Sequence, residues 1–98
     1  MSKDNRYITI QDLILKGYIR SLTEIFEKEL ISRSKVARDL GVNPGRFTRN
    51  LKAPERFILK DLYALAVLIG IDNMTILRLV NSDYENAKKS KGKVKKGK

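Results

Sequence analysis

Apolar residues recur every three or four positions along much of the chain, which is the spacing of an α-helix rather than of a strand. Between residues 10 and 29 this pattern predicts either one helix or two, because Gly17 inside it costs about 1 kcal/mol relative to alanine and can mark a break. Both alternatives stay open at this point. The apolar positions of this segment are Ile10, Leu13, Ile14, Tyr18, Ile19, Leu22, Ile25, Phe26 and Leu30.

Two short helices with a glycine turn between them are predicted in the middle of the chain. Ser32 is a suitable N-cap for a helix over residues 33–40, and Gly41 can end that helix because glycine tolerates a left-handed backbone. Asn43 can cap a second helix that begins at Pro44, since the first helical N–H has no partner inside the helix and its loss costs nothing. The sequence thus predicts a helix, a tight turn and a second helix.

Two further helices are predicted after a breaker at residues 53–55. The first runs from about residue 59 to Gly70, is apolar on nearly all sides and is expected in the centre of the core. The last is short, is capped by Asp72 or Asn73, and is expected to end where the chain turns polar at Asn81. No segment has the pattern of a strand.

The predicted fold is therefore all-α, a compact bundle of about five helices. Residues 1–87 are expected to form one domain. Residues 88–98 are rich in lysine and have almost nothing to bury, so they are expected to form a disordered basic tail.

Composition excludes several classes of function. The 98 residues include no cysteine and no histidine, so disulfides, thiolate metal sites and the commonest general base are all ruled out. We expect no catalytic residue, no metal and no cofactor. No segment approaches the roughly 20 apolar residues that span a bilayer, and the N-terminus lacks the apolar run of a signal peptide. We expect a cytoplasmic protein with no membrane contact.

The net charge of +10 is concentrated in two regions. Residues 33–60 contain eight basic and two acidic side chains, which gives this segment a charge of +6. Residues 88–98 contain seven lysines and no acidic residue. Charge concentrated in this way favours a polyanionic partner, of which nucleic acid is the commonest.

The segment SRSKVARDLGVNPGRFTRNL, residues 32–51, resembles the helix-turn-helix of the lambda-repressor and Cro-like family. Ala37 matches the small residue where the two helices approach most closely, and Gly41 matches the turn. The later segment ALAVLIGIDNMTILRLV is similar to the fourth and fifth helices of that family. The motif core is Val36, Ala37, Leu40, Gly41, Val42, Phe47 and Leu51.

The resemblance implies a transcriptional regulator of the phage-repressor type, associated with the nucleoid, which binds double-stranded DNA with its second helix in the major groove. Arginine can donate two hydrogen bonds to guanine, and threonine can contact a base through its hydroxyl or methyl group. The base-reading candidates are Asn43, Arg46, Thr48 and Arg49. The phosphate-contact candidates are Arg33, Ser34, Lys52, Arg56 and Lys60.

Three departures from the family pattern bear on this prediction. Asn50 replaces a residue that is more often apolar, Pro44 and Gly45 replace longer side chains that read bases in many members, and Arg33 replaces a frequent glutamine. With fewer base-reading groups, specificity is expected to be modest or to depend on DNA shape.

Other readings of the sequence stay open. A basic architectural or RNA-associated protein would bind polyanions without sequence choice, and an antitoxin or accessory subunit would dock its N-terminal helix onto a protein partner. A homodimer is also open, with Leu15 or Tyr18 as candidates for an exposed contact. An enzyme is the least favoured class, because the carboxylates form no short motif.

Overall fold

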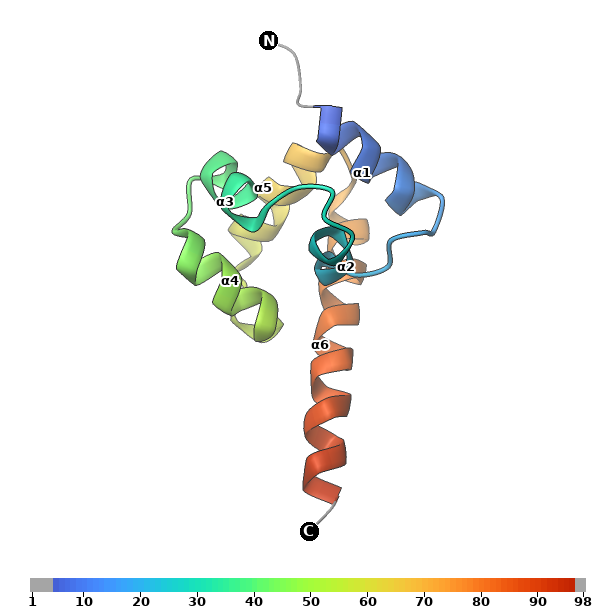
Figure 1. Ribbon diagram of the computed structural model, residues 1–98, viewed down its shortest axis with the longest axis vertical. Helices are drawn as coiled ribbons and strands as arrows, with labels where there is room; N and C mark the ends of the chain where they lie inside the picture. The colour runs from blue at the N-terminus through green and yellow to red at the C-terminus, as the bar shows by residue number, and fades with distance from the viewer. Residues whose placement is uncertain (1–4, 97–98) are drawn as a thin grey trace.

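The structure is a computed structural model that describes the backbone of residues 5–96 and the side chains of residues 5–89, and every regular element in that part of the chain is a helix (Figure 1). This confirms the predicted all-α class. The elements are α1 (Asn5–Leu15), α2 (Leu22–Glu27), α3 (Arg33–Leu40), α4 (Pro44–Lys52), the short 3₁₀ helix η1 (Pro54–Arg56), α5 (Leu59–Ile69) and α6 (Asn73–Lys96).

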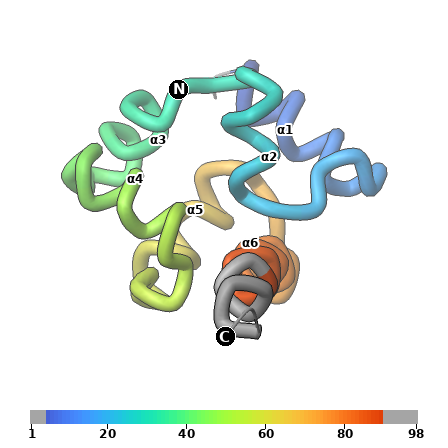
Figure 2. Tube along the Cα trace, turned by 60° about the horizontal axis from the view of Figure 1, so that its bottom comes forward, coloured from blue at the N-terminus to red at the C-terminus, as the bar shows by residue number. Residues whose placement is uncertain are grey.

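Helix α5 packs against α1, α3 and α6 and so links the two sides of the molecule. Figures 1 and 2 both show α3 and α4 on one side and α1 and α2 on the other. The apolar residues of α5 do not all face inward, however. Leu62, Leu65 and Ala66 are buried, whereas Val67 is 75% exposed, because only one face of the helix meets its neighbours. The helix expected in the centre of the core therefore contributes one face to the core and leaves Val67 in solvent.

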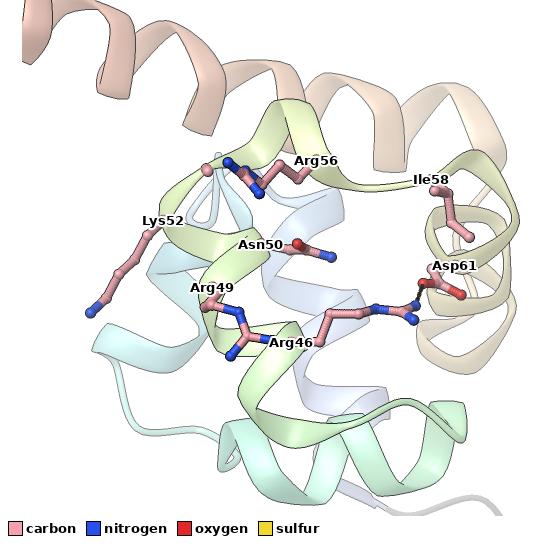
Figure 3. Close-up of a pocket in the computed structure, with 8 residues that line it drawn as sticks. Arg46, Arg49, Asn50, Lys52, Arg56, Ile58 and Asp61 are labelled. Carbon is pink, nitrogen blue, oxygen red and sulfur yellow. Dashed lines mark hydrogen bonds and ion pairs between the residues drawn. The ribbon is translucent and has the colours of Figure 1, made fainter.

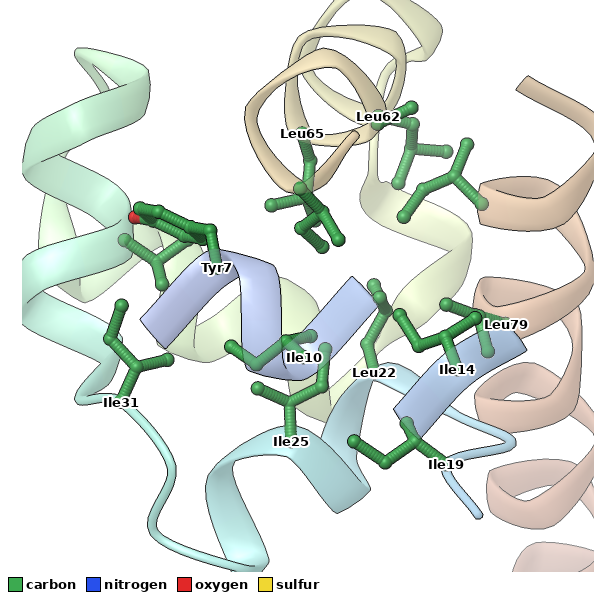
Figure 4. Packing of buried hydrophobic residues seen from close by; sticks show 14 of the residues in the cluster. Tyr7, Ile10, Ile14, Ile19, Leu22, Ile25, Ile31, Leu62, Leu65 and Leu79 are labelled. Atoms are coloured by element: carbon green, nitrogen blue, oxygen red, sulfur yellow. The ribbon is translucent and has the colours of Figure 1, made fainter. Parts of the chain in front are cut away.

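The core lies where α1 crosses the other helices. Tyr7, Ile10 and Ile14 of α1 point into it and are buried together with residues of α2, α5 and α6 (Figure 4). The Tyr7 hydroxyl donates a hydrogen bond of 2.6 Å to Asp39 Oδ2, which ties α1 to α3. The first helix is therefore an integral part of the bundle.

The chain between residues 10 and 30 forms two helices. Gly17 has a φ of 84°, a left-handed conformation that ends the first helical segment, and the Tyr18 N–H donates to the Leu13 carbonyl over 2.9 Å. Ser21 then caps α2, its hydroxyl accepting from the Glu24 N–H at 3.3 Å. Ser21 and Glu24 have the spacing of a capping box, a signal in the sequence that would have decided between one helix and two.

The last helix does not end at Asn81, contrary to the sequence prediction. The predicted cap is present, since Asp72 Oδ1 accepts from the Thr75 N–H at 2.8 Å, and hydrogen bonds from Thr75 lower the pKa of Asp72. Beyond Asn81 the helix continues because neither glycine nor proline follows until residue 92. A disordered tail was predicted for residues 88–98. Almost all of this segment lies outside the residues whose side chains the structure describes.

A buried carboxylate also holds α6 in place. Asp83 accepts a hydrogen bond from the Leu22 N–H at 2.8 Å and longer ones from the Thr23 N–H at 3.3 and 3.4 Å, so it satisfies donors in the first turn of α2. Burial raises the pKa of Asp83, although the hydrogen bonds from Thr23 and Leu22 act in the opposite direction. This contact joins residues 61 apart in sequence.

Among the described residues no single helix is long and apolar enough to cross a membrane, and α5 with the first part of α6 reaches that length only across a bend of 115°.

Candidate nucleic-acid interface

The turn between α3 and α4 is built from the capping residues that the sequence predicts. Ser32 caps α3 through a 3.1 Å bond from the Lys35 N–H, and Gly41 ends this helix with a left-handed φ of 77°. Asn43 Oδ1 accepts from the Arg46 N–H at 3.0 Å, and Pro44 occupies the first turn of α4. These four local features fix where α4 begins and in which direction it runs.

Phe47 anchors α4 to the rest of the molecule. Its side chain is 2% exposed, and its ring meets Phe26 and Phe57 edge to face, with ring centroids 5.8 and 6.0 Å away. Val36 and Ala37 of α3 are buried beside it, and Leu40, Val42 and Leu51 pack partly buried against the same core. The predicted motif core is therefore one packed unit, and rotation of α4 about its axis is prevented.

With Phe47 inward, the opposite side of α4 forms a ridge of Gly45, Arg49 and Lys52, all of which are exposed. Arg46 lies on one flank of this ridge and Thr48 on the other. A Cβ atom at Gly45 would lie 3.1 Å from Asn43 Oδ1, which is a tight contact, and 3.5 Å from Arg49 Nη1, which is an ordinary van der Waals contact. Glycine at this position therefore leaves the capping oxygen of Asn43 unobstructed.

An open groove of about 720 Å³ runs between α4, η1 and the start of α5, and it contains four of the predicted contact residues (Figure 3). Arg46, Arg49, Lys52 and Arg56 all line it. The Asn50 side chain points into it from α4, as Figure 3 shows, although the residue is only 7% exposed overall. Asn50 therefore contributes a polar surface to the groove.

Arg46, a predicted base-reading residue, is engaged within the protein. Arg46 Nη2 lies 2.5 Å from Asp61 Oδ2 across the groove, with side-chain exposures of 47% for the arginine and 15% for the aspartate. Lys52, by contrast, extends from α4 on the side away from Arg46 (Figure 3). The groove thus combines four cationic side chains with a single carboxylate.

A second groove, of about 680 Å³, lies where the start of α3 meets the other flank of α4. Arg33 and Ser34 of α3 and Thr48 of α4 line it together, which joins two predicted phosphate contacts to a predicted base contact. Arg6 of α1 also lines this groove and was not among the predicted residues. The sequence around Arg6 does not indicate that this residue lies at the groove, because α1 reaches the groove only through the packing of the bundle.

Two predicted residues stand apart from these grooves. Asn43 is occupied as the cap of α4, which uses its side-chain oxygen. Lys60 is exposed on the first turn of α5 and lines neither groove. Comparisons of the chain with protein-family models, with curated proteins and with solved structures gave no match.

Proposed function

We propose that this chain is a sequence-recognising, duplex-DNA-binding transcriptional regulator in which α3 and α4 act as a helix-turn-helix and α4 enters the major groove. The observation that carries the proposal is the basic ridge of α4, where Arg49 and Lys52 face solvent while Phe47 locks the helix beneath them. A helix held in this way presents its outer side chains in a fixed register, which reading of base edges requires.

Each groove combines a proposed base contact with proposed phosphate contacts. Arg49 and Thr48, on the exposed side of α4, are placed to meet base edges, since arginine pairs with guanine O6 and N7 and threonine contacts thymine or a base acceptor. Arg33 and Ser34 at the start of α3, with Lys52 and Arg56 beside α4, are placed to meet phosphates on either side. Occupation of an operator by such a module would block or recruit polymerase at the nucleoid without any catalytic step.

The test is in vitro selection from a random duplex library with the full chain at near-physiological salt. Excess unselected competitor duplex suppresses the general attraction of the seven lysines in residues 88–98. Enrichment of one motif supports the proposal, and a two-fold repeat spaced by about 10 base pairs would add a homodimer. Recovery of bound DNA without any motif would overturn it in favour of a non-specific polyanion binder.

Arg49→Ala is the corresponding variant. We expect it to weaken binding to the selected duplex by about 1 to 3 kcal/mol and binding to random duplex much less, because a base contact is lost. Arg20→Ala is the matched control, since Arg20 is exposed in the connection between α1 and α2 and lines neither groove. Equal losses on both duplexes would reduce Arg49 to a phosphate contact.

A further inference from the structure

We infer that Asp61 is a specificity-determining residue of the proposed DNA-binding surface, which positions Arg46 for a base and keeps its charge from adding to general phosphate attraction. The inference rests on the proposed function and concerns a residue that is neither basic nor part of α4. It starts from the contact between Arg46 Nη2 and Asp61 Oδ2 at 2.5 Å.

The contact leaves most of the Arg46 guanidinium available. A guanidinium carries five N–H donors in a rigid planar fork, and the bond to Asp61 comes from Nη2 alone. The Arg46 side chain is 47% exposed and lines the groove, so the remaining N–H donors of its guanidinium can meet a ligand. An acceptor pair such as guanine O6 and N7 could then bind a fork whose orientation is already set.

The same contact lowers the value of Arg46 as a general cation. Asp61 carries the opposite charge at a distance of one hydrogen bond, and its own side chain is 15% exposed, so the pair is partly shielded from water. Asp61 is the one carboxylate among the residues that line this groove, and it bonds to Arg46 rather than to Arg49, Lys52 or Arg56. A passing phosphate is therefore attracted to those three cations more than to Arg46.

Asp61 can hold this position without depending on Arg46 alone. It lies in the first turn of α5, whose N-cap residue Ile58 makes no side-chain capping bond. A carboxylate there is favoured by the unpaired N–H groups and the positive end of the helix dipole. Asp61 thus belongs to a rigid helix, and Arg46 reaches it from another, which is the arrangement that fixes a reading side chain.

The experiment compares Asp61→Asn with Glu55→Gln in the full chain. Both changes raise the net charge by one, but Glu55 lies on η1 and does not line the groove. Dissociation constants are measured by fluorescence anisotropy on the selected duplex and on random duplex over a range of salt concentrations. Circular dichroism checks that both variants are folded.

For Asp61→Asn we expect tighter binding to random duplex, by about fivefold, and a salt slope steeper by about 0.9, because one more cation releases counterions. The ratio of specific to random affinity should fall. Glu55→Gln should leave that ratio unchanged. In the Arg46→Gln background Asp61→Asn should no longer alter the ratio, since the residue acts through Arg46.

Arg46→Lys supplies a second variant that leaves α5 intact. Lysine keeps the charge but has no planar fork, so we expect the salt slope to stay the same while the affinity ratio falls. The inference is overturned if Asp61→Asn and Glu55→Gln change the ratio equally, or if Arg46→Lys preserves it. Failure of the proposed function is distinct, because then the unmodified chain itself would not separate the two duplexes.

Discussion

The buried carboxylate of Asp83 predicts a specific loss of stability when it is removed. Asp83→Ala leaves the N–H of Leu22, a fully buried residue, without its 2.8 Å partner. An unsatisfied buried donor costs about 1 to 3 kcal/mol. We expect the free energy of unfolding to fall by about this amount, 1 to 3 kcal/mol.

The Asp83→Asn variant separates the contribution of the hydrogen bonds to stability from that of the carboxylate charge. The amide oxygen can still accept from the Leu22 N–H, while the cost of burying a carboxylate disappears, so we expect a value within about 1 kcal/mol of the unmodified chain at pH 7. The two variants should therefore differ clearly from each other. Urea unfolding followed by circular dichroism measures both.

The raised pKa of Asp83 gives the same site a pH signature. Burial favours the protonated form in the folded chain, so the folded state binds this proton more tightly than the unfolded state does. The contribution of this group to stability is present below its ordinary pKa of 3.8 and is lost as the pH rises through the raised pKa. Asp83→Asn lacks this contribution.

The difference in unfolding free energy between the unmodified chain and Asp83→Asn should therefore decline with rising pH above 3.8 and then become constant. Glu24 and Glu27 line the same small cavity and are present in both proteins, so the comparison isolates the change at residue 83. A difference that does not vary with pH, or an Asp83→Ala variant within about 0.5 kcal/mol of the unmodified chain, would refute this account of the site.

Two further predictions concern the α3–α4 unit. Phe47→Ala should lower the free energy of unfolding, measured in urea, by about 3 to 5 kcal/mol, because the Phe47 ring fills the space between Phe26 and Phe57. The control is Tyr18→Ala, at a position that is 66% exposed, which should cost about 0.5 kcal/mol or less. Gly41→Ala should cost about 1 kcal/mol for its left-handed backbone alone, since a Cβ there meets nothing within 4 Å. Gly41→Asn, which tolerates that conformation, should cost less; an equal cost would locate the strain elsewhere.

The parts of the fold that could be predicted from the sequence are those whose signals are local. Ser32, Gly41, Asn43 and Pro44 each act within four residues, so the start of α3, the turn and the start of α4 were predicted correctly. The end of the last helix was not, because polar composition alone does not end a helix and no glycine or proline follows Asn81 until residue 92.

The side chains of the candidate interface could be chosen by type but not by direction. The periodicity of α4 places Arg49 and Lys52 outward, and the structure agrees. Nothing near Arg46 or Asp61 in sequence indicates that they meet across a groove, since their contact depends on how η1 redirects the chain. Asp83 is a similar case, because its partners are residues 22 and 23 at the other end of the chain.

The contrast between local and distant contacts has a consequence for the order of folding. The caps of α3 and α4 close over three or four residues, so they need almost no loop closure and can form while the rest of the chain is still open. The Asp83 contact requires closure of a segment of about 60 residues, so we predict that it forms after the rate-limiting step of folding. Loss of the Asp83 carboxylate would then act mainly on the rate of unfolding, whereas a disrupted turn at Gly41 would slow folding itself.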